Sequence, residues 1–282
     1  MDEVTTGLPP SIRVLHGIDR ERPIRVFLVE VTVRDTSLQI SAEPAVGEDR
    51  RETPTEMARR TGACVLINGG YYWIDREGRG RQIGLLARGG EVLSAPLDGI
   101  VWQRVRYPVA RATIGAVAGG LPEVSWASGS RSRTVRWPDP LDNRLGRPAL
   151  APDSSRATPW PVYWALSAGP ALVWNGEARV YREEEGFFDT YIPRLHPRSA
   201  VGITDDGRLL FVVVDGRQPH SRGVYLEELA SILRDLGAVR AINLDGGGSS
   251  SLVVNGTLVN RPSGSDSERE IASALAVQCP AE

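Results

Sequence analysis

Three consecutive glycines, Gly246 to Gly248, stand between two apolar runs near the C-terminal end of the chain. The run before them, residues 241–244, contains the polar Asn243 and leads into Asp245, and three serines follow the glycines. Consecutive glycines lose more backbone freedom on folding than other residues do, so they are kept where the backbone must approach another group closely. The stretch therefore predicts either a polar binding loop or a plain turn between two strands.

The residues before this stretch restrict the fold further. Residues 210–214 form an apolar run that ends at Asp215, residues 226–237 carry apolar side chains at helical spacing and end in glycine, and residues 239–244 form the next apolar run. A strand, a helix and a strand in this order favour a right-handed βαβ unit with parallel strands. Because parallel strands end at the same edge of a sheet, we expect Asp215 and Asp245 at one edge, where such sheets bind ligands.

Two further pairs of runs are predicted to be β-hairpins. Residues 24–33 are β-branched and partly alternating, and residues 38–42 follow them after a polar turn. Residues 195–204 and 209–214 flank the turn Asp205-Asp206-Gly207. Both patterns are typical of antiparallel strand pairs.

A helix is predicted over residues 53–62. Thr53 and Glu56 have the spacing of a capping box, and Gly62 provides the stop signal. The short apolar run that follows, residues 63–67, predicts a strand buried on both faces.

These patterns lead us to expect an α+β fold with an α/β-like core, in which helices flank a mixed β-sheet that ends in the C-terminal βαβ unit. We expect a single domain over residues 24–282, preceded by an N-terminal extension over residues 1–23. An irregular insertion is expected at about residues 104–161, where proline, aspartate and arginine accumulate from residue 136 onward. A connection of that length is expected to form a long loop over the site.

Composition excludes several classes of partner and mechanism. The formal net charge of −2 gives no electrostatic basis for binding nucleic acid, and no apolar run approaches the ~20 residues of a membrane span. All 33 basic residues are arginines, so an anion site must use guanidinium groups and a lysine Schiff base is excluded. Residues 1–4 do not resemble the start of a signal peptide, which predicts a cytoplasmic protein or an exported one whose signal was removed.

The two cysteines do not form a disulfide framework. Cys64 and Cys279 each lie in an apolar, strand-like run, so two buried free thiols are the default expectation. One bridge between the two ends of the fold is the alternative.

Several side chains are candidates for chemistry. Asp215 and Asp245 could divide acid and base roles if their environments separate their pKa values, or they could merely cap turns. His196 is a candidate proton donor or a hydrogen-bond partner of its loop, and Arg198 and Arg269 are candidates for an anion clamp. The histidines have no zinc-binding spacing. No cofactor is required by the sequence, and a divalent cation, Ca²⁺ or Mg²⁺, held by aspartates is the open alternative.

A series of motifs, taken in order, resembles the phosphodiester glycosidase family, that of the NAGPA-like domain. The motifs are Asn68-Gly69-Gly70-Tyr71-Tyr72, Ser167-Ala168-Gly169-Pro170, His196-Pro197-Arg198-Ser199, Asp215-Gly216-Arg217, Asn243-Leu244-Asp245-Gly246-Gly247-Gly248-Ser249 and Arg269. The resemblance extends from about residue 24 to residue 277. The chain departs from it at residues 222–225, where bacterial relatives often have Gly-Met-Thr, and at residues 104–156, which match nothing.

The resemblance implies hydrolysis of the glycosidic bond of a sugar-1-phosphodiester, such as a GlcNAc-1-phospho-glycan of a cell wall or an exopolysaccharide. It implies Asp245 as the first catalytic carboxylate, with Asp215 and His196 as further catalytic candidates. The substrate-binding residues that it implies are Asn68, Gly69, Gly70, Tyr71, Arg198, Ser199, Arg217, Asn243, Gly246, Gly247, Gly248, Ser249 and Arg269. The metal requirement and the oligomeric state stay open.

The aromatic residues Tyr71, Tyr72 and Trp73 have two interpretations, stacking on a sugar face or packing in the core. Two other functions also stay open at this point. One is a glycan-binding protein that lacks activity, and the other is a phosphodiesterase that cleaves the P–O bond.

Overall fold

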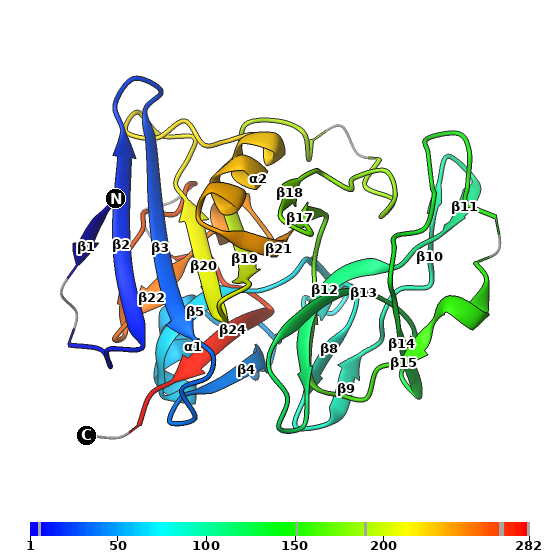
Figure 1. The fold of residues 1–282 in the computed structure, drawn as a ribbon, viewed down its shortest axis with the longest axis horizontal. Helices are drawn as coiled ribbons and strands as arrows, with labels where there is room; N and C mark the ends of the chain where they lie inside the picture. The colour runs from blue at the N-terminus through cyan, green and yellow to red at the C-terminus, as the bar shows by residue number, and fades with distance from the viewer. Residues whose placement is uncertain (5–6, 151, 189–190, 265–267, 281–282) are drawn as a thin grey trace.

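The computed structural model describes residues 1–4, 7–150, 152–188, 191–264 and 268–280 (Figure 1). Within these ranges the chain forms 24 strands and two α-helices. Strands hold 46% of the residues and helices 9%. The fold is therefore mostly β, and the expected α+β class with flanking helices is wrong.

The first sheet has eight strands. Their spatial order is β1 (Asp2–Val4), β2 (Ile12–Asp19), β3 (Ile24–Thr32), β20 (Arg208–Val214), β19 (Arg198–Thr204), β21 (Ala238–Asn243), β17 (Ala171–Trp174) and β18 (Glu177–Ala178). Neighbours in this sheet are antiparallel, so the expected mixed sheet is also wrong. β2 pairs with β3 along its whole length, which makes part of the expected N-terminal extension an integral strand.

The second sheet has five strands, in the order β23 (Thr257–Leu258), β22 (Leu252–Val254), β5 (Ala63–Asn68), β24 (Ser273–Gln278) and β4 (Gln39–Pro44). The hairpin expected between residues 24–33 and 38–42 is wrong, because β4 pairs with β24 instead of β3. Both edges of β3 are already occupied, by β2 and β20. The chain therefore leaves the first sheet after β3 and enters the second.

The third sheet has seven strands, in the order β15 (Thr158–Pro159), β14 (Arg133–Trp137), β13 (Glu123–Ser130), β12 (Arg111–Val117), β16 (Val162–Ser167), β8 (Leu86–Arg88) and β9 (Glu91–Ser94). Two hairpins stand apart, formed by β6 (Tyr72–Ile74) with β7 (Gly80–Gln82) and by β10 (Gly99–Trp102) with β11 (Val105–Pro108).

Most of the insertion expected at residues 104–161 is thus regular β-structure. The described residues of this range after β14, 138–150 and 152–157, contain no strand, only a short 3-10 helix at Ser154–Arg156. Asn143 in this segment donates to the carbonyls of Pro108 and Glu184, at 2.7 and 3.0 Å. These bonds attach the segment to the end of β11 rather than to the glycine loop.

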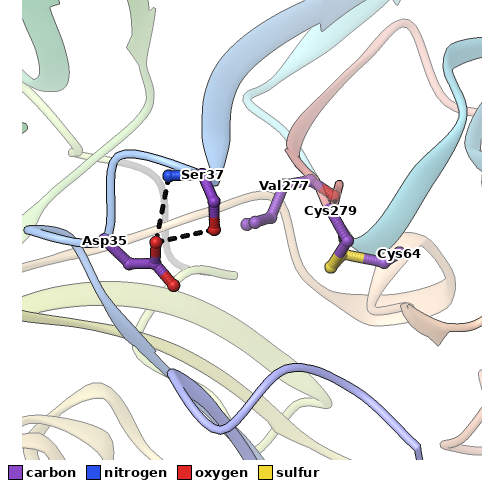
Figure 2. Close-up of a disulfide and its surroundings, with 5 residues drawn as sticks. All are labelled: Asp35, Ser37, Cys64, Val277 and Cys279. Atoms are coloured by element: carbon purple, nitrogen blue, oxygen red, sulfur yellow. Dashed lines mark hydrogen bonds between the residues drawn. A yellow bond between two sulfur atoms is a disulfide. The ribbon is translucent and has the colours of Figure 1, made fainter. Parts of the chain in front are cut away.

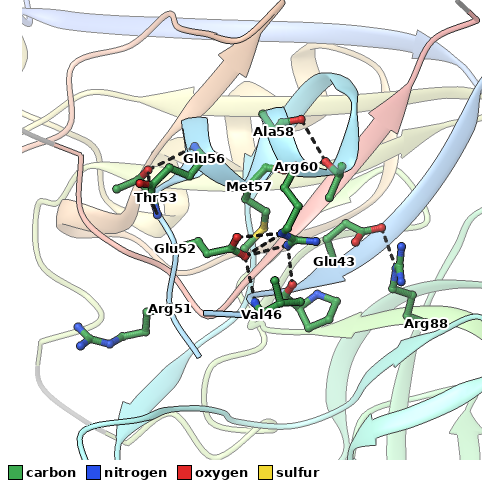
Figure 3. A network of polar contacts seen from close by, with 12 residues as sticks. Glu43, Val46, Arg51, Glu52, Thr53, Glu56, Met57, Ala58, Arg60 and Arg88 are labelled. Carbon is green, nitrogen blue, oxygen red and sulfur yellow. Dashed lines mark hydrogen bonds and ion pairs between the residues drawn. The ribbon is translucent and has the colours of Figure 1, made fainter. Parts of the chain in front are cut away.

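Each helix covers the outer face of one sheet. α1 (Pro54–Thr61) has the predicted capping box and ends at Gly62 with a φ of 66°. It packs on the second sheet through Met57 and Ala58, and Figure 3 shows Arg60 bonded to Glu52 and to a carbonyl at the end of β4. α2 (Leu226–Asp235) covers the first sheet. In the described ranges, no helix has the length and apolar character of a membrane span.

The three sheets share one hydrophobic core. Their inner faces contribute residues such as Phe211 and Ile242 from the first sheet, Ile67 and Leu275 from the second, and Ile114 from the third. Figure 1 shows the third sheet standing beside the other two. The curled sheets pack around this core, so that ends of strands from different sheets lie next to one another.

One disulfide joins Cys64 in β5 to Cys279 just after β24 (Figure 2). The two Cα atoms are 5.7 Å apart and 215 positions apart in the sequence. The default expectation of free thiols is therefore wrong, and the single bridge is the correct alternative. A link that closes so long a loop restricts the unfolded chain and typically contributes about 2–4 kcal/mol of stability.

The unit β20–α2–β21 differs from the expected βαβ unit in one respect. β19 lies between the two strands and is antiparallel to both. β20 and β21 therefore run parallel without being neighbours, roughly 10 Å apart at the usual strand spacing. Their C-terminal ends do share one edge, as predicted, and the start of β19 lies between them.

Candidate active site

Four segments meet at this edge. They are the ends of β20 and β21, the start of β19 and, from the second sheet, the end of β5. Asn68 joins three of them: its Nδ2 donates to the carbonyl of Asp245 at 2.7 Å, and its Oδ1 accepts from Ser199 Oγ at 2.6 Å and from the Ser251 amide at 3.1 Å. Since Asn68 and Ser199 are fully buried, they form the scaffold on which the site is built.

The glycine loop is closely approached on each side. A Cβ atom at Gly246 would lie 2.9 Å from the carbonyl oxygen of Pro197, and one at Gly248 would lie 3.0 Å from that of Ser263. At Gly247, where φ is +65°, it would lie 3.4 Å from the Arg217 guanidinium. The close approach inferred from the sequence is therefore real, and it is made by neighbouring backbone and by arginine.

Two exposed arginines flank this loop. Arg217 lies against Gly247, and Arg269 lies against Gly248, with its Cδ 3.3 Å from the position of an added Cβ. Neither arginine forms an ion pair with a carboxylate in the described part of the chain. Both guanidinium groups are thus available to an anion bound above the loop.

The backbone of the loop offers less to an anion than we expected. The Gly246 amide donates to Asp245 Oδ1 at 3.0 Å, the Gly247 amide to Pro197 at 3.0 Å, and the Ser249 amide to Gly246 at 3.3 Å. Three of the four amides from Gly246 to Ser249 therefore have protein acceptors. The arginine side chains therefore offer more uncommitted donors at this loop than its backbone does.

Asp245 opens the loop and is partly buried. Its backbone is fixed at both ends, because its amide donates to Gly69 at 3.0 Å and its carbonyl accepts from Asn68. Burial raises the pKa of the Asp245 carboxyl to about 6, against the opposing effects of Ser249, Arg269 and the Gly246 amide. A carboxyl that exchanges its proton near neutral pH is suited to general acid–base chemistry.

Asp215 has a different environment. Its carboxylate accepts from Asn260 Nδ2 and the Arg261 amide, both at 3.0 Å, and from His220 Nε2 at 3.4 Å. The residue is only 1% exposed. These bonds hold the segment at residues 260–261 against the end of β20.

His196 contacts Arg217. Its Nδ1 lies 2.8 Å from Arg217 Nη2, and its Nε2 lies 2.9 Å from the carbonyl of Tyr191. Since Arg217 can only donate and the carbonyl can only accept, these bonds favour the neutral ring with its proton on Nε2. Burial lowers the pKa of His196, and Arg198 and Arg217 lower it further. His196 thus orients Arg217 in this structure.

Arg198 lies beneath the loop. Its Nε donates to Val224 at 3.3 Å, and its Nη2 donates to the carbonyls of Ile192 and Arg194, both at 2.7 Å. The side chain is 3% exposed, and this burial lowers its pKa to about 10. Much of its donor capacity therefore holds neighbouring backbone in place.

Tyr71 and Asn243 form an inner wall of the site. The Tyr71 hydroxyl donates to Gly169 at 2.9 Å and accepts from Asn243 Nδ2 at 2.8 Å. Burial raises the pKa of this phenol, and Asp245 raises it further. Gly70 admits no side chain, because a Cβ there would lie 2.3 Å from the carbonyl oxygen of Ser167.

The three aromatics differ in position. Tyr71 packs against Phe187, with ring centroids 5.7 Å apart. Tyr72 donates to Glu270 at 2.8 Å and lies 5.9 Å below the Arg269 guanidinium. Trp73 is 55% exposed on the β6–β7 hairpin. Tyr71 therefore has a packing role, and Trp73 is the most accessible of the three to a sugar.

Sequence reasoning missed three residues beside this wall, Arg111, Glu185 and Phe187. The Arg111 guanidinium lies 3.7 Å from the centre of the Phe187 ring. Glu185 is fully buried, and burial raises its pKa to about 7. Arg111 does have a sequence signal, because it is the first residue of an apolar strand. That strand lies in the stretch that we expected to be irregular.

The described residues contain no group of three His, Cys, Asp or Glu side chains placed to hold a metal ion. Several surface hollows of the described structure lie away from the glycine loop. One, of about 580 Å³, is lined by residues such as Trp137, Trp174 and Arg240, near the opposite end of β21.

Comparisons with known proteins agree with this arrangement. The family model described as phosphodiester glycosidase (NAGPA) matches residues 61–278. The bovine (Bos taurus) N-acetylglucosamine-1-phosphodiester alpha-N-acetylglucosaminidase is 30% identical over 266 residues, which cover 90% of this chain and 44% of the relative. The chain therefore spans less than half of that relative's length.

Solved structures share the fold. A hypothetical protein from Synechocystis matches with a TM-score of 0.64 and 19% identity, over 96% of this chain and 64% of that one. The zebrafish NAGPA catalytic domain, auto-inhibited by its pro-peptide, matches with a TM-score of 0.63 and 24% identity, over 96% of this chain and 84% of that one. Because the family model covers both the β5 end with Asn68 and the glycine loop with Asp245, this chain belongs to the phosphodiester glycosidase family.

Proposed function

We propose that this chain hydrolyses the glycosidic bond of a sugar-1-phosphodiester and that Asp245 is its catalytic base. One observation carries the proposal. A carboxyl whose pKa is raised to about 6 opens a glycine loop that is flanked by two arginines, Arg217 and Arg269. The name of the bovine relative supports N-acetylglucosamine as the sugar to test first.

The proposed reaction needs one base and an anion clamp. The Asp245 carboxylate takes a proton from water, the water oxygen bonds to the anomeric carbon, and the bond from that carbon to the phosphate oxygen breaks. The bonding electrons leave with the phosphate, which becomes a monoester. Arg217 and Arg269 stabilise the negative charge that develops on it.

No strong acid is required in this scheme. The leaving group is a phosphate monoester dianion, a weak base that departs without protonation, so two guanidinium groups replace the general acid of ordinary glycosidases. This agrees with the positions of the other two candidates. Asp215 is occupied by three protein donors, and His196 has both ring nitrogens bonded.

The test is hydrolysis of a GlcNAc-1-phosphodiester in oxygen-18 water, followed by mass spectrometry of both products. We expect the label in the sugar, because water attacks carbon. Label in the phosphate would mean that the P–O bond breaks and the protein is a phosphodiesterase. Binding without turnover across a panel of sugar phosphodiesters would mean a glycan-binding protein.

The natural polymer is a separate question. We propose a cell-wall or exopolysaccharide glycan with sugar-phosphate links as the class to test first. Release of reducing sugar from such a polymer would support it, and turnover of small diesters alone would contradict it.

A further inference from the structure

Arg111 is a buried arginine beside the wall of the site that Tyr71 forms, separated from Tyr71 by the ring of Phe187. It is the first residue of β12 in the third sheet and is only 8% exposed. Its guanidinium lies 3.7 Å from the centre of the Phe187 ring, and that ring packs on Tyr71. One aromatic ring therefore connects Arg111 to the phenol that bonds Asn243 beside the glycine loop.

The charge on Arg111 has no hydrogen-bonded partner. Across the described ranges, no carboxylate oxygen lies within 4.0 Å of its guanidinium, its side chain donates to no acceptor, and its buried Nε is unbonded. Arg198, which is buried to a similar extent, has three carbonyl acceptors. Buried charged groups are normally paired, because leaving one unpaired costs several kcal/mol.

Glu185 is the described acid whose charge acts on Arg111, but it forms no hydrogen bond with the guanidinium. Its Oε1 accepts from the Ala171 amide at 2.7 Å and from Trp126 Nε1 at 2.9 Å, and its Oε2 accepts from the Ala112 amide at 2.9 Å. Its field favours the charged form of Arg111, while its oxygens are committed to these donors. The guanidinium therefore keeps its donors for another acceptor.

Arg111 also lies within electrostatic range of the reacting region. The charges of Asp245, Arg198 and Arg111 all act on the pKa of the Tyr71 hydroxyl. The glycine loop already supplies Arg217 and Arg269 for the single negative charge of a phosphodiester. A further cation beside the wall that Tyr71 forms exceeds what that charge requires.

Resting on the function proposed above, we propose that Arg111 binds a second anionic group of the substrate, a carboxylate or a phosphate on a sugar next to the scissile bond. The substrate class is then a glycan phosphodiester that carries at least two negative groups. The planar fork of arginine suits either group, since both present two oxygens to it.

Binding calorimetry at fixed ionic strength tests this with three probes. Glucose 1-phosphate carries one anionic group, glucose 1,6-bisphosphate carries a second phosphate, and glucuronic acid 1-phosphate carries a carboxylate. We expect the wild type to bind at least one two-anion probe about tenfold more tightly than glucose 1-phosphate. The probe with the larger ratio identifies the second group as phosphate or carboxylate.

Arg111→Gln should reduce that ratio to near one. Arg240→Gln is the matched control, because Arg240 also lies over an aromatic ring, 3.8 Å from the centre of Trp174, but near the opposite end of β21. The control should keep the wild-type ratio. A wild-type ratio near one, or a ratio that Arg111→Gln does not reduce, would overturn the proposal.

A second variant covers a failure of Arg111→Gln to fold, which a thermal melt detects. Arg111→Lys keeps the charge but loses the planar fork, so its ratio should fall about threefold, and an unreduced ratio would again overturn the proposal. Because binding is measured without turnover, the two hypotheses fail separately. An inactive protein that shows the Arg111-dependent ratio refutes the proposed reaction alone.

Discussion

The ends of β20 and β21 carry the same short motif, an aspartate followed by glycine, at the same edge of one sheet. At the end of β20, Asp215 is 1% exposed and receives three hydrogen bonds from residues elsewhere in the chain. At the end of β21, Asp245 is partly buried and accepts from the amide of its own neighbour, Gly246. Two equivalent positions therefore provide one carboxylate bonded within the protein and one titratable carboxyl.

The difference shows that strand topology determines where a carboxylate lies, whereas the hydrogen-bond donors around it determine its role. A carboxylate that accepts several hydrogen bonds from the protein is held in one orientation and has fewer lone pairs left for a substrate. A partly buried carboxylate with few donors keeps oxygens free for a substrate or a water molecule. Each prediction below perturbs one side of this comparison.

The largest effect is expected from Asp245→Asn. The amide cannot take a proton from water, so kcat should fall about 10³-fold or more on a GlcNAc-1-phosphodiester. Asp235→Asn, an exposed change near the end of α2, is the control and should keep wild-type turnover. A kcat of Asp245→Asn within tenfold of wild type would remove Asp245 from the mechanism.

The same variant has a predicted stability signature. The folded pKa of about 6 lies above the ordinary value of 3.8, so the Asp245 carboxyl favours folding while protonated and loses that contribution as the pH rises from about 4 to 6. Asparagine does not titrate. Denaturant unfolding should therefore show Asp245→Asn at least as stable as the wild type at pH 7, which separates loss of chemistry from loss of fold.

Asp215→Asn is expected to lose stability and keep its activity, the reverse of Asp245→Asn. One side-chain oxygen becomes an NH₂ group that faces the donors of Asn260 and Arg261, so the free energy of unfolding should fall by about 2–3 kcal/mol. Urea unfolding measures this loss. The folded fraction should keep kcat within about tenfold of wild type, and a 10³-fold loss in a stable variant would restore Asp215 as a catalytic residue.

Local signals in the sequence predicted the parts of the fold that depend on short-range interactions. The capping box at Thr53, the stop at Gly62 and the hairpin of β19 and β20 are set by neighbouring residues and were confirmed. The shared edge of Asp215 and Asp245 followed from strand direction alone. That inference survives because β20 and β21 remain parallel across the strand between them.

Long-range pairing explains what the sequence did not predict. Two of the three donors to Asp215 come from residues 260–261, 45 and 46 positions later, and no periodicity relates the two segments. The third sheet pairs strands that lie far apart in the sequence, such as β12 and β8 with β16, so Arg111 was not predicted near the site. The predicted fold class is wrong because the pattern of one helical crossover was extended to the whole chain.

A moderate effect is expected from His196→Ala. His196 accepts from Arg217 at 2.8 Å, so its removal should free the guanidinium and raise KM for the phosphodiester about tenfold, with a smaller change in kcat. A larger change in KM than in kcat would identify His196 as a residue that positions Arg217. A dominant loss of kcat, comparable with that of Asp245→Asn, would instead identify His196 as a proton donor and remove the single-base scheme.

The smallest effect concerns the pH dependence of the rate. Because the base form of Asp245 is needed, kcat/KM should rise with pH and level off above its pKa of about 6. Arg269 lowers this pKa, so Arg269→Gln should shift the midpoint upward by up to about one pH unit. Arg217 lowers the pKa of His196 instead. If Arg217→Gln moves the midpoint and Arg269→Gln does not, the acidic limb belongs to His196, and Asp245 loses its assignment as the titrating base.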